Sequence, residues 1–525
     1  MKRKLLALTL SIIAMSLSGC NYFNQIINDF INPSDYDQTD EYIPTEQGVN
    51  KIKASYTYSD YTDNSAYDIS ASPLKGESHL LVIPIWFTDS DTYIKGTGKD
   101  KVRNDIQLAY FGTSEETGWE SVSSYYKKDS FNNITISGKV SEWYECGKAS
   151  TDYYSENNSS TKTTTLVNNA VKWYFTNHDD SKTNYDADKN GIIDGVMLIY
   201  GAPDYYAMSE SSADNMWAYC YWLQSGQKPN TSSPITNVFF WASYDFMYSS
   251  GTITKSLVGS QYGSGDQSNC KIDAHTYIHE MGHVFGLEDY YDYNGKVSLA
   301  AGFSMQDHNV GAHDPFSRFA LGWVNPFVPT ETKKFTVGAI ENTGECVLLP
   351  YEGYTGSPFD EYILLELFTP SNLNELDCKY SYAGTQTGPK NTGVRIWHVD
   401  ARLASYVSST NYNITNNPKD GKIVLATSNT LYASDGENNA RCSKLTGNYN
   451  YNTLHLIKND KNAKYSDNSF LSNSMLFKTG DTFSLSEFKT QFTNGTQLNS
   501  KKTFPWTVKF DEVGSASMTI TVTKN

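Results

Sequence analysis

The sequence predicts an α/β (α+β) domain over residues 76–325, followed by a β-sandwich-like domain over residues 326–525. In the first part, short apolar runs typical of buried strands alternate with segments of helical spacing, the order that builds a sheet covered by helices. After Pro326, strand-like runs and polar loops replace the helical periodicity. The 525 residues are 39% hydrophobic and 14% aromatic, enough to form a sizeable core.

The elements of the first domain are expected in a mixed order. Buried strands are expected at 79–87, 196–200 and 238–241, and helices near 100–110, from about 119 onward, and over 166–175. Residues 134–143 predict a hairpin with Gly138 near its turn. In the second domain, strands are expected at 335–337, 346–349, 362–367, 394–399, 422–426 and 518–522.

The first residues indicate export. Lys2, Arg3 and Lys4 precede an apolar stretch from Leu5 to Leu17 that is too short to span a bilayer as a mature helix. The next residues, Leu-Ser-Gly-Cys ending at Cys20, resemble the bacterial lipobox, which implies a lipoprotein signal peptide over residues 1–20 and lipidation of Cys20.

Residues 21–75 are rich in Asp, Asn, Tyr, Ser and Thr and are expected to be a tether or linker. Part of this segment could instead pack as an extra strand or a pro-segment. Six cysteines besides Cys20 could form three disulfides outside the cytoplasm, with 15 alternative connectivities. The net charge of −16 repels phosphate backbones, so nucleic acid is not expected as a partner.

The motif His279-Glu280-Met281-Gly282-His283 is the strongest chemical signal in the chain. Histidines at i and i+4 lie on one helical face and can bind one zinc ion, while Glu280 lies close enough to act on a water. With nine histidines in 525 residues, a chance HExxH match is on the order of 1% for the whole chain.

Residues after the motif complete a ligand set. Gly286 suits the left-handed position that ends a helix, and a chain reversal there would return Asp289 toward the metal as third ligand. Glu288 and Asp292 lie on the same loop and are alternative ligands. Three protein ligands leave a fourth position open, which is typical of catalytic zinc.

The pattern HExxHxxGxxD resembles the metzincin class of zinc peptidases. The stretches HEMGHVFGLEDYY (279–291), GFSMQD (302–307) and HDPFSRFALGW (313–323) are similar to those of the immune inhibitor A-like metalloproteases. The resemblance covers roughly residues 76–400 and implies a zinc metalloprotease catalytic domain over 76–325. It also implies that Met305 is the methionine of the turn beneath the zinc.

A weaker motif precedes the second buried strand. Asp186, Asp188, Asn190 and Asp194 occupy oxygen-ligand positions of an EF-hand-like calcium loop, but Met197 stands where a bidentate Glu is expected. An unusual calcium site and a metal-free turn remain equal alternatives.

The resulting hypothesis is a monomeric zinc metalloendopeptidase of the bacterial cell envelope, held by its lipid on the extracytoplasmic side of a membrane. Zinc bound by His279, His283 and Asp289 would activate a water, and Glu280 would be its general base for cleaving protein or peptide substrates. The alternative is a lipid-anchored adhesin or binding protein that keeps an inactive metalloprotease fold. The intact Glu280 argues against it, and the many Tyr and Trp residues, which suit glycan binding, argue for it.

Overall fold

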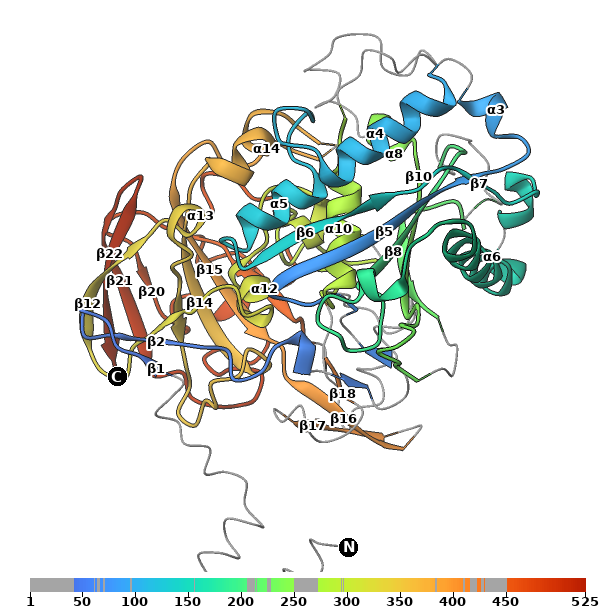
Figure 1. Cartoon of the computed structure of the whole chain (residues 1–525). Helices are drawn as coiled ribbons and strands as arrows, with labels where there is room; N and C mark the ends of the chain where they lie inside the picture. The colour runs from blue at the N-terminus through green and yellow to red at the C-terminus, as the bar shows by residue number, and fades with distance from the viewer. Residues whose placement is uncertain are drawn as a thin grey trace, which may run out of the picture.

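A computed structural model gives the architecture of the chain (Figure 1). It describes residues 42–60, 62–63, 67–68, 71–94, 97–154, 156–204, 213, 215–223, 228–249, 272–293, 295, 297–382, 385–408, 411–415, 423–425, 429 and 451–525. The predicted mixture of helices and several sheets is confirmed. Cys20, the expected lipidation site, lies outside the described residues, as do Cys270 and Cys442.

A mostly parallel sheet forms the centre of the N-terminal half. Its strands are β6 (Ile134–Val140), β5 (Gly76–Trp86), β8 (Gly195–Tyr200), β10 (Val238–Ser243) and the antiparallel edge strand β9 (Tyr219–Trp222), in that order, with β7 (Tyr144–Glu145) also pairing with β5. The strands β8 and β10 are buried along their whole length. Such continuous apolar runs are typical of parallel strands that are covered on both faces.

Helices cover the two faces of this sheet. One face packs against α4 (Lys99–Phe111), α5 (Val122–Asp129) and α10 (His275–Val284), and the other against α6 (Glu156–Asn177). In Figure 1, α4 and α5 lie above the strands and α6 lies at the right of the sheet. Two short helices, α3 (Ser90–Tyr93) and α8 (Phe246–Ser249), follow the carboxyl ends of β5 and β10.

The predicted hairpin over residues 134–143 is wrong. Residues 134–140 form the single strand β6, which runs parallel to β5 with Gly138 opposite Leu80. A Cβ atom at Gly138 would lie 2.1 Å from the carbonyl oxygen of Leu80. The glycine therefore permits a close approach of two backbones rather than a turn.

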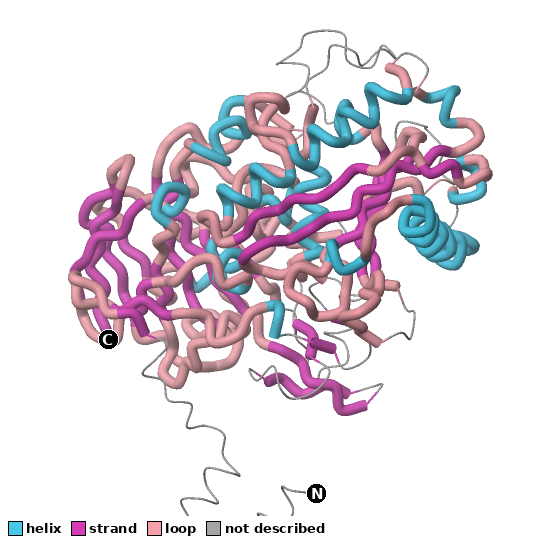
Figure 2. The backbone as a smooth tube through the Cα atoms, viewed as in Figure 1, coloured by secondary structure: helices cyan, strands magenta, loops and turns pink. Residues whose placement is uncertain are grey.

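The C-terminal half is built mainly of strands and loops (Figure 2). A seven-stranded sheet has the order β1 (Tyr42–Ile43), β2 (Asn50–Ile52), β11 (Phe327–Val328), β13 (Val347–Leu349), β14 (Glu361–Phe368), β15 (Gly393–Asp400) and β19 (Leu454–Ile457). A four-stranded sheet contains β12 (Lys333–Gly338), β22 (Ser517–Lys524), β21 (Trp506–Val513) and β20 (Thr482–Phe483). Smaller sheets are formed by β17 (Asn411–Thr415), β16 (Leu403–Ser408) and β18 (Ile423–Leu425), and by β3 (Thr62–Asp63) and β4 (Tyr67–Asp68). The α-helices described in this half and at its junction with the first are α11 (Met305–His308), α12 (Pro315–Ala320), α13 (Ile340–Thr343) and α14 (Glu375–Lys379).

The seven-stranded sheet belongs to two hydrophobic cores at once. In β14, Ile363 and Leu365 pack with the four-stranded sheet, whereas Leu364 and Phe368 pack with the helices of the N-terminal half. This alternation follows from the two-residue period of a strand. One core therefore runs across both halves of the chain.

The packed part of the chain begins earlier than the sequence suggested. Residues from 42 onward, which fall in the expected tether, add β1 and β2 to the edge of the seven-stranded sheet. Tyr58 is buried and makes an edge-on contact with Phe359, with ring centroids 5.1 Å apart. The alternative of an extra strand thus describes this segment better than a tether.

The described cysteines and helices bear on possible disulfides and membrane-spanning segments. The four described cysteines, Cys146, Cys220, Cys346 and Cys378, form no disulfide. Among the described helices, none combines the length and the apolar character needed to cross a bilayer.

Candidate metal centre

The helix α10 carries the HExxH motif and is fixed at both ends. At its start, Asp273 accepts a hydrogen bond from the backbone N–H of His275 at 2.9 Å. At its end, Gly286 has a φ of 101°, and the N–H of Leu287 bonds to the carbonyl of Gly282 at 3.0 Å. This Schellman ending confirms the left-handed position predicted for Gly286 and turns the chain back beside the helix.

The reversal brings Asp289 to the two histidines. Oδ1 of Asp289 lies 3.0 Å from Nε2 of His279 and 3.2 Å from Nε2 of His283, and the two Nε2 atoms are 3.2 Å apart. Ligand atoms at zinc distances of 2.0–2.1 Å form a tetrahedron with edges of about 3.3 Å. The three atoms thus form a triangle close to one face of a zinc tetrahedron, and these residues fit a zinc ion.

Backbone carbonyls orient both imidazoles. Nδ1 of His279 donates to the carbonyl oxygen of Met305 at 2.8 Å, and Nδ1 of His283 donates to that of Leu287 at 2.7 Å. Because a carbonyl can only accept, the hydrogen of each neutral ring is on Nδ1 and the lone pair on Nε2 faces the triad. Met305 is the first residue of α11, and its side chain is buried in the core.

The charges of the triad perturb one another. Burial disfavours the charged form of His283, but Asp289 outweighs it and raises the pKa of that imidazole to about 10. Burial likewise disfavours the carboxylate of Asp289, yet the two histidines hold its pKa well below its usual range. A carboxylate confined with two imidazoles favours positive charge at this point.

Glu280 lies on α10 between the two histidines and is 6% exposed. Its Oε2 atom is buried without a hydrogen-bond partner, which is rare for a carboxylate oxygen and expected where a ligand completes the site. Burial raises the pKa of Glu280, although the neighbouring histidines oppose this effect. The residue is therefore held beside the triad without being one of its ligands.

Neither a scan against protein-family models nor a search of curated proteins finds a match. The chemistry of the side chains is therefore what characterises the site.

The loop after the helix places the alternative ligands elsewhere. Oδ2 of Asp292 accepts from the N–H of Val297 at 3.3 Å, and Glu288 is not in the group that converges with the histidines.

Sequence reasoning missed Tyr293, whose hydroxyl donates to Oδ2 of Asp289 at 2.5 Å. A tyrosine four residues after a ligand has no motif that would have marked it.

Three further histidines do not join the triad. His275 is buried between the rings of Trp119 and Tyr382 and is paired with carboxylates, and the side chain of His308 is 41% exposed and contacts Asp307. The third, His313, lies two residues before α12. It is fully buried, with Nδ1 2.8 Å from Oδ2 of Asp129.

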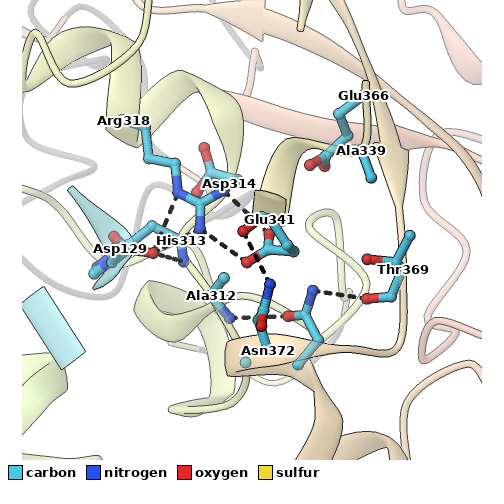
Figure 3. Close-up of polar contacts among 12 residues, drawn as sticks. Asp129, Ala312, His313, Asp314, Arg318, Ala339, Glu341, Glu366, Thr369 and Asn372 are labelled. Carbon is cyan, nitrogen blue, oxygen red and sulfur yellow. Dashed lines mark hydrogen bonds and ion pairs between the residues drawn. The ribbon is translucent and has the colours of Figure 1, made fainter. Parts of the chain in front are cut away.

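The guanidinium of Arg318 donates hydrogen bonds to the carboxylates of both Asp129 and Glu341 (Figure 3). All three side chains are buried, and Asp129 comes from α5 whereas Glu341 comes from α13. Burial favours protonation of Asp129, but Arg318 and His313 lower its pKa to about 2. This network ties the segment behind the metal centre to the β-rich half.

The acidic loop before β8 forms a second cluster. Asp186, Asp188 and Asp194 come close enough to share one cation. Oδ2 of Asp186 accepts from the N–H of Gly191 at 3.1 Å, while its Oδ1 is buried without a partner. Asn190 accepts from the N–H of Ile192 at 2.8 Å, as in a turn closed by a side chain.

Proposed function

We propose that this chain is a zinc-dependent endopeptidase of the metzincin type, similar to the immune inhibitor A-like metalloproteases. The observation that carries the proposal is the convergence of His279, His283 and Asp289 beside the buried, unpaired Oε2 of Glu280. The proposed domains are a zinc peptidase domain over 76–325 and a β-sandwich-like domain over 326–525.

The metal ligands and Glu280 have different roles in the proposed reaction. A zinc ion held by the triad would supply a Lewis acid that polarises the scissile carbonyl and acidifies a water. Glu280 takes the proton from the attacking water and returns it to the leaving amine. His279 and His283 keep their ligand nitrogens aimed by donating from Nδ1 to backbone carbonyls.

The decisive experiment compares wild type with Glu280→Gln on a denatured protein substrate, with and without a chelator. Zinc content should be equal, and cleavage should fall by about 10²- to 10⁴-fold in the variant. Glu288→Gln is the matched control, because Glu288 lies on the ligand loop outside the triad, and it should cleave normally. Equal cleavage by wild type and Glu280→Gln, or none by zinc-replete wild type, would overturn the proposal. Absence of cleavage together with tight glycan binding would favour the adhesin alternative.

We also propose that residues 186–194 bind calcium. The support is the buried Oδ1 of Asp186, which has no protein partner, and the closeness of the carboxylates of Asp188 and Asp194. The carboxylate of Asp194 also accepts hydrogen bonds from the backbone N–H groups of His79 and Ala187, which leaves fewer of its lone pairs for a cation. Calcium there would fix the loop before β8 and take no part in catalysis.

Localisation is a further part of the proposal. Cys20 would carry a lipid that holds the enzyme on the extracytoplasmic side of a membrane. Cys20→Ser should release the protein into the medium or the periplasm and abolish its labelling by a radioactive fatty acid. Unchanged membrane fractionation of this variant would contradict the anchor.

A further inference from the structure

The loop that carries the third ligand is held from the β-rich half of the chain. Tyr290, the residue after Asp289, is fully buried and has both backbone groups paired. Its N–H donates to the carbonyl of Gln306 at 2.8 Å, and its carbonyl accepts from the side chain of Asn429 at 2.7 Å. Asp289 is therefore followed by a residue whose peptide groups are fixed on two sides.

Asn429 is fixed in turn by the first residue of β19. Its Oδ1 accepts from the N–H of Leu454 at 3.0 Å, and its Nδ2 donates to the carbonyl of Leu454 at 2.9 Å. The second hydrogen of the same amide goes to the carbonyl of Tyr290, so both donors are used. Asn429 is 1% exposed, so water does not compete for these bonds.

The segment leading to Met305 is held from the same side. The N–H groups of Leu456 and Leu471 each donate at 2.8 Å, to the carbonyls of Leu299 and Ala301 respectively. Nη1 of Arg395, on β15, donates to the carbonyl of Phe303 at 3.0 Å. These bonds place the backbone just before Met305, whose carbonyl orients His279.

We infer that Asn429 is a positioning residue of the metal centre, which it serves by fixing the peptide that follows Asp289. This inference rests on the proposed zinc site, and it gives the β-rich half a defined task there. The side chain of Asn429 touches no ligand atom. Its effect on metal binding passes through the Tyr290 carbonyl to the backbone of the ligand loop.

The chain offers a matched control at the other end of the same strand. Gln491 is also fully buried, and its side chain accepts from the N–H of Lys458 and donates to the carbonyl of Lys458, each at 2.8 Å. Lys458 directly follows β19, so Gln491 pairs with this strand end as Asn429 pairs with its start. Gln491 has no bond to the ligand loop, and its third contact is the carbonyl of Asp460.

The test measures zinc affinity by competition with a chelator, using Asn429→Ala, Asn429→Asp and Gln491→Ala in the full chain. The aspartate keeps the size and the acceptor facing the N–H of Leu454 but cannot donate to Tyr290. Both Asn429 variants should bind zinc about 10- to 100-fold more weakly than wild type, the range for residues that orient ligands. Gln491→Ala should keep wild-type zinc affinity while its thermal midpoint falls.

The outcomes separate the two hypotheses. Wild-type protein that takes up no zinc would overturn the proposed function and this inference with it. Tight zinc binding by wild type and equally tight binding by the Asn429 variants would overturn the positioning role alone. Failure of both Asn429 variants to fold, with Gln491→Ala folded, would assign the residue to overall stability and would also overturn the positioning role.

Discussion

The hydroxyl of Tyr293 donates to Oδ2 of Asp289 at 2.5 Å, while Oδ1 of the same carboxylate faces the two histidines. The two oxygens thus have different partners, and the tyrosine fixes which of them is offered to a metal. Such a hydrogen bond to a ligating carboxylate restricts its rotation and tunes its basicity.

Tyr293→Phe should therefore weaken zinc binding by about 10-fold, because Asp289 loses the bond that orients it. Chelator competition measures this change. Tyr380→Phe removes the hydroxyl of another exposed tyrosine that lies on no ligand loop, and it should have no effect. Equal zinc affinity of Tyr293→Phe and wild type would show that the 2.5 Å contact does not orient the ligand.

His275 should make stability depend on pH. Burial lowers its pKa, but Asp273 at 2.7 Å and Asp377 at 3.4 Å outweigh this and raise it to about 10. The rings of Trp119 and Tyr382 stack on its two faces and bring no charge.

Because the pKa of His275 is raised in the folded protein, the charged imidazole stabilises the fold fully below the unfolded-state pKa of about 6.5. This stabilisation is lost as the pH rises toward 10. The difference in unfolding free energy between wild type and His275→Gln should therefore shrink across this pH range, by on the order of a few kcal/mol. Chemical denaturation of both proteins from pH 6 to 10 measures the difference. Two parallel stability curves would mean that His275 is not charged in the folded protein.

Arg318 should be one of the most sensitive positions for folding. Arg318→Met removes the cation between Asp129 and Glu341 and leaves two carboxylates buried without it. Breaking a buried ion pair from one side costs about 3–5 kcal/mol. Urea unfolding should show a loss of this size.

The control for Arg318 is Lys51→Met, which breaks a pair with Glu345 in which both side chains are 24% exposed. Exposed pairs contribute about 1 kcal/mol or less, so this variant should remain close to wild type. Similar losses in the two variants would contradict the importance assigned to burial.

Calcium should raise the unfolding free energy of wild type by about 2.7 kcal/mol at a concentration 100 times the dissociation constant. Asp186→Asn should abolish this gain, because it neutralises the carboxylate whose Oδ1 has no protein partner. Asp179→Asn, at an exposed position outside the loop, should preserve it. Thermal unfolding with calcium or magnesium measures the effect, and a calcium response unchanged in Asp186→Asn would exclude this loop as the site.

The sequence predicted what local patterns encode. The spacing of His279 and His283 and the position of Gly286 are sufficient to place two imidazoles on one helical face and to reverse the chain after them. Continuous apolar runs likewise located β5, β8 and β10.

What the sequence could not supply depends on contacts between distant segments. Asn429 lies 139 positions from Tyr290, and no local pattern distinguishes it from other asparagines. Gly138 was expected to mark a turn, because its close approach to Leu80 is visible only once two strands are paired. No local pattern marks His313 as buried, because its partner, Asp129, lies 184 positions earlier.

The strand β15 presents Val394 and Ile396 to one core and Arg395 and Trp397 to the other. A slip of one residue in its pairing would exchange these faces and carry the guanidinium away from Phe303. A single-residue insertion in this strand should thus disturb the metal centre more than many point changes in nearer loops. Insertions and deletions in β15 are therefore constrained, because each would shift the register of this strand against β14 and β19.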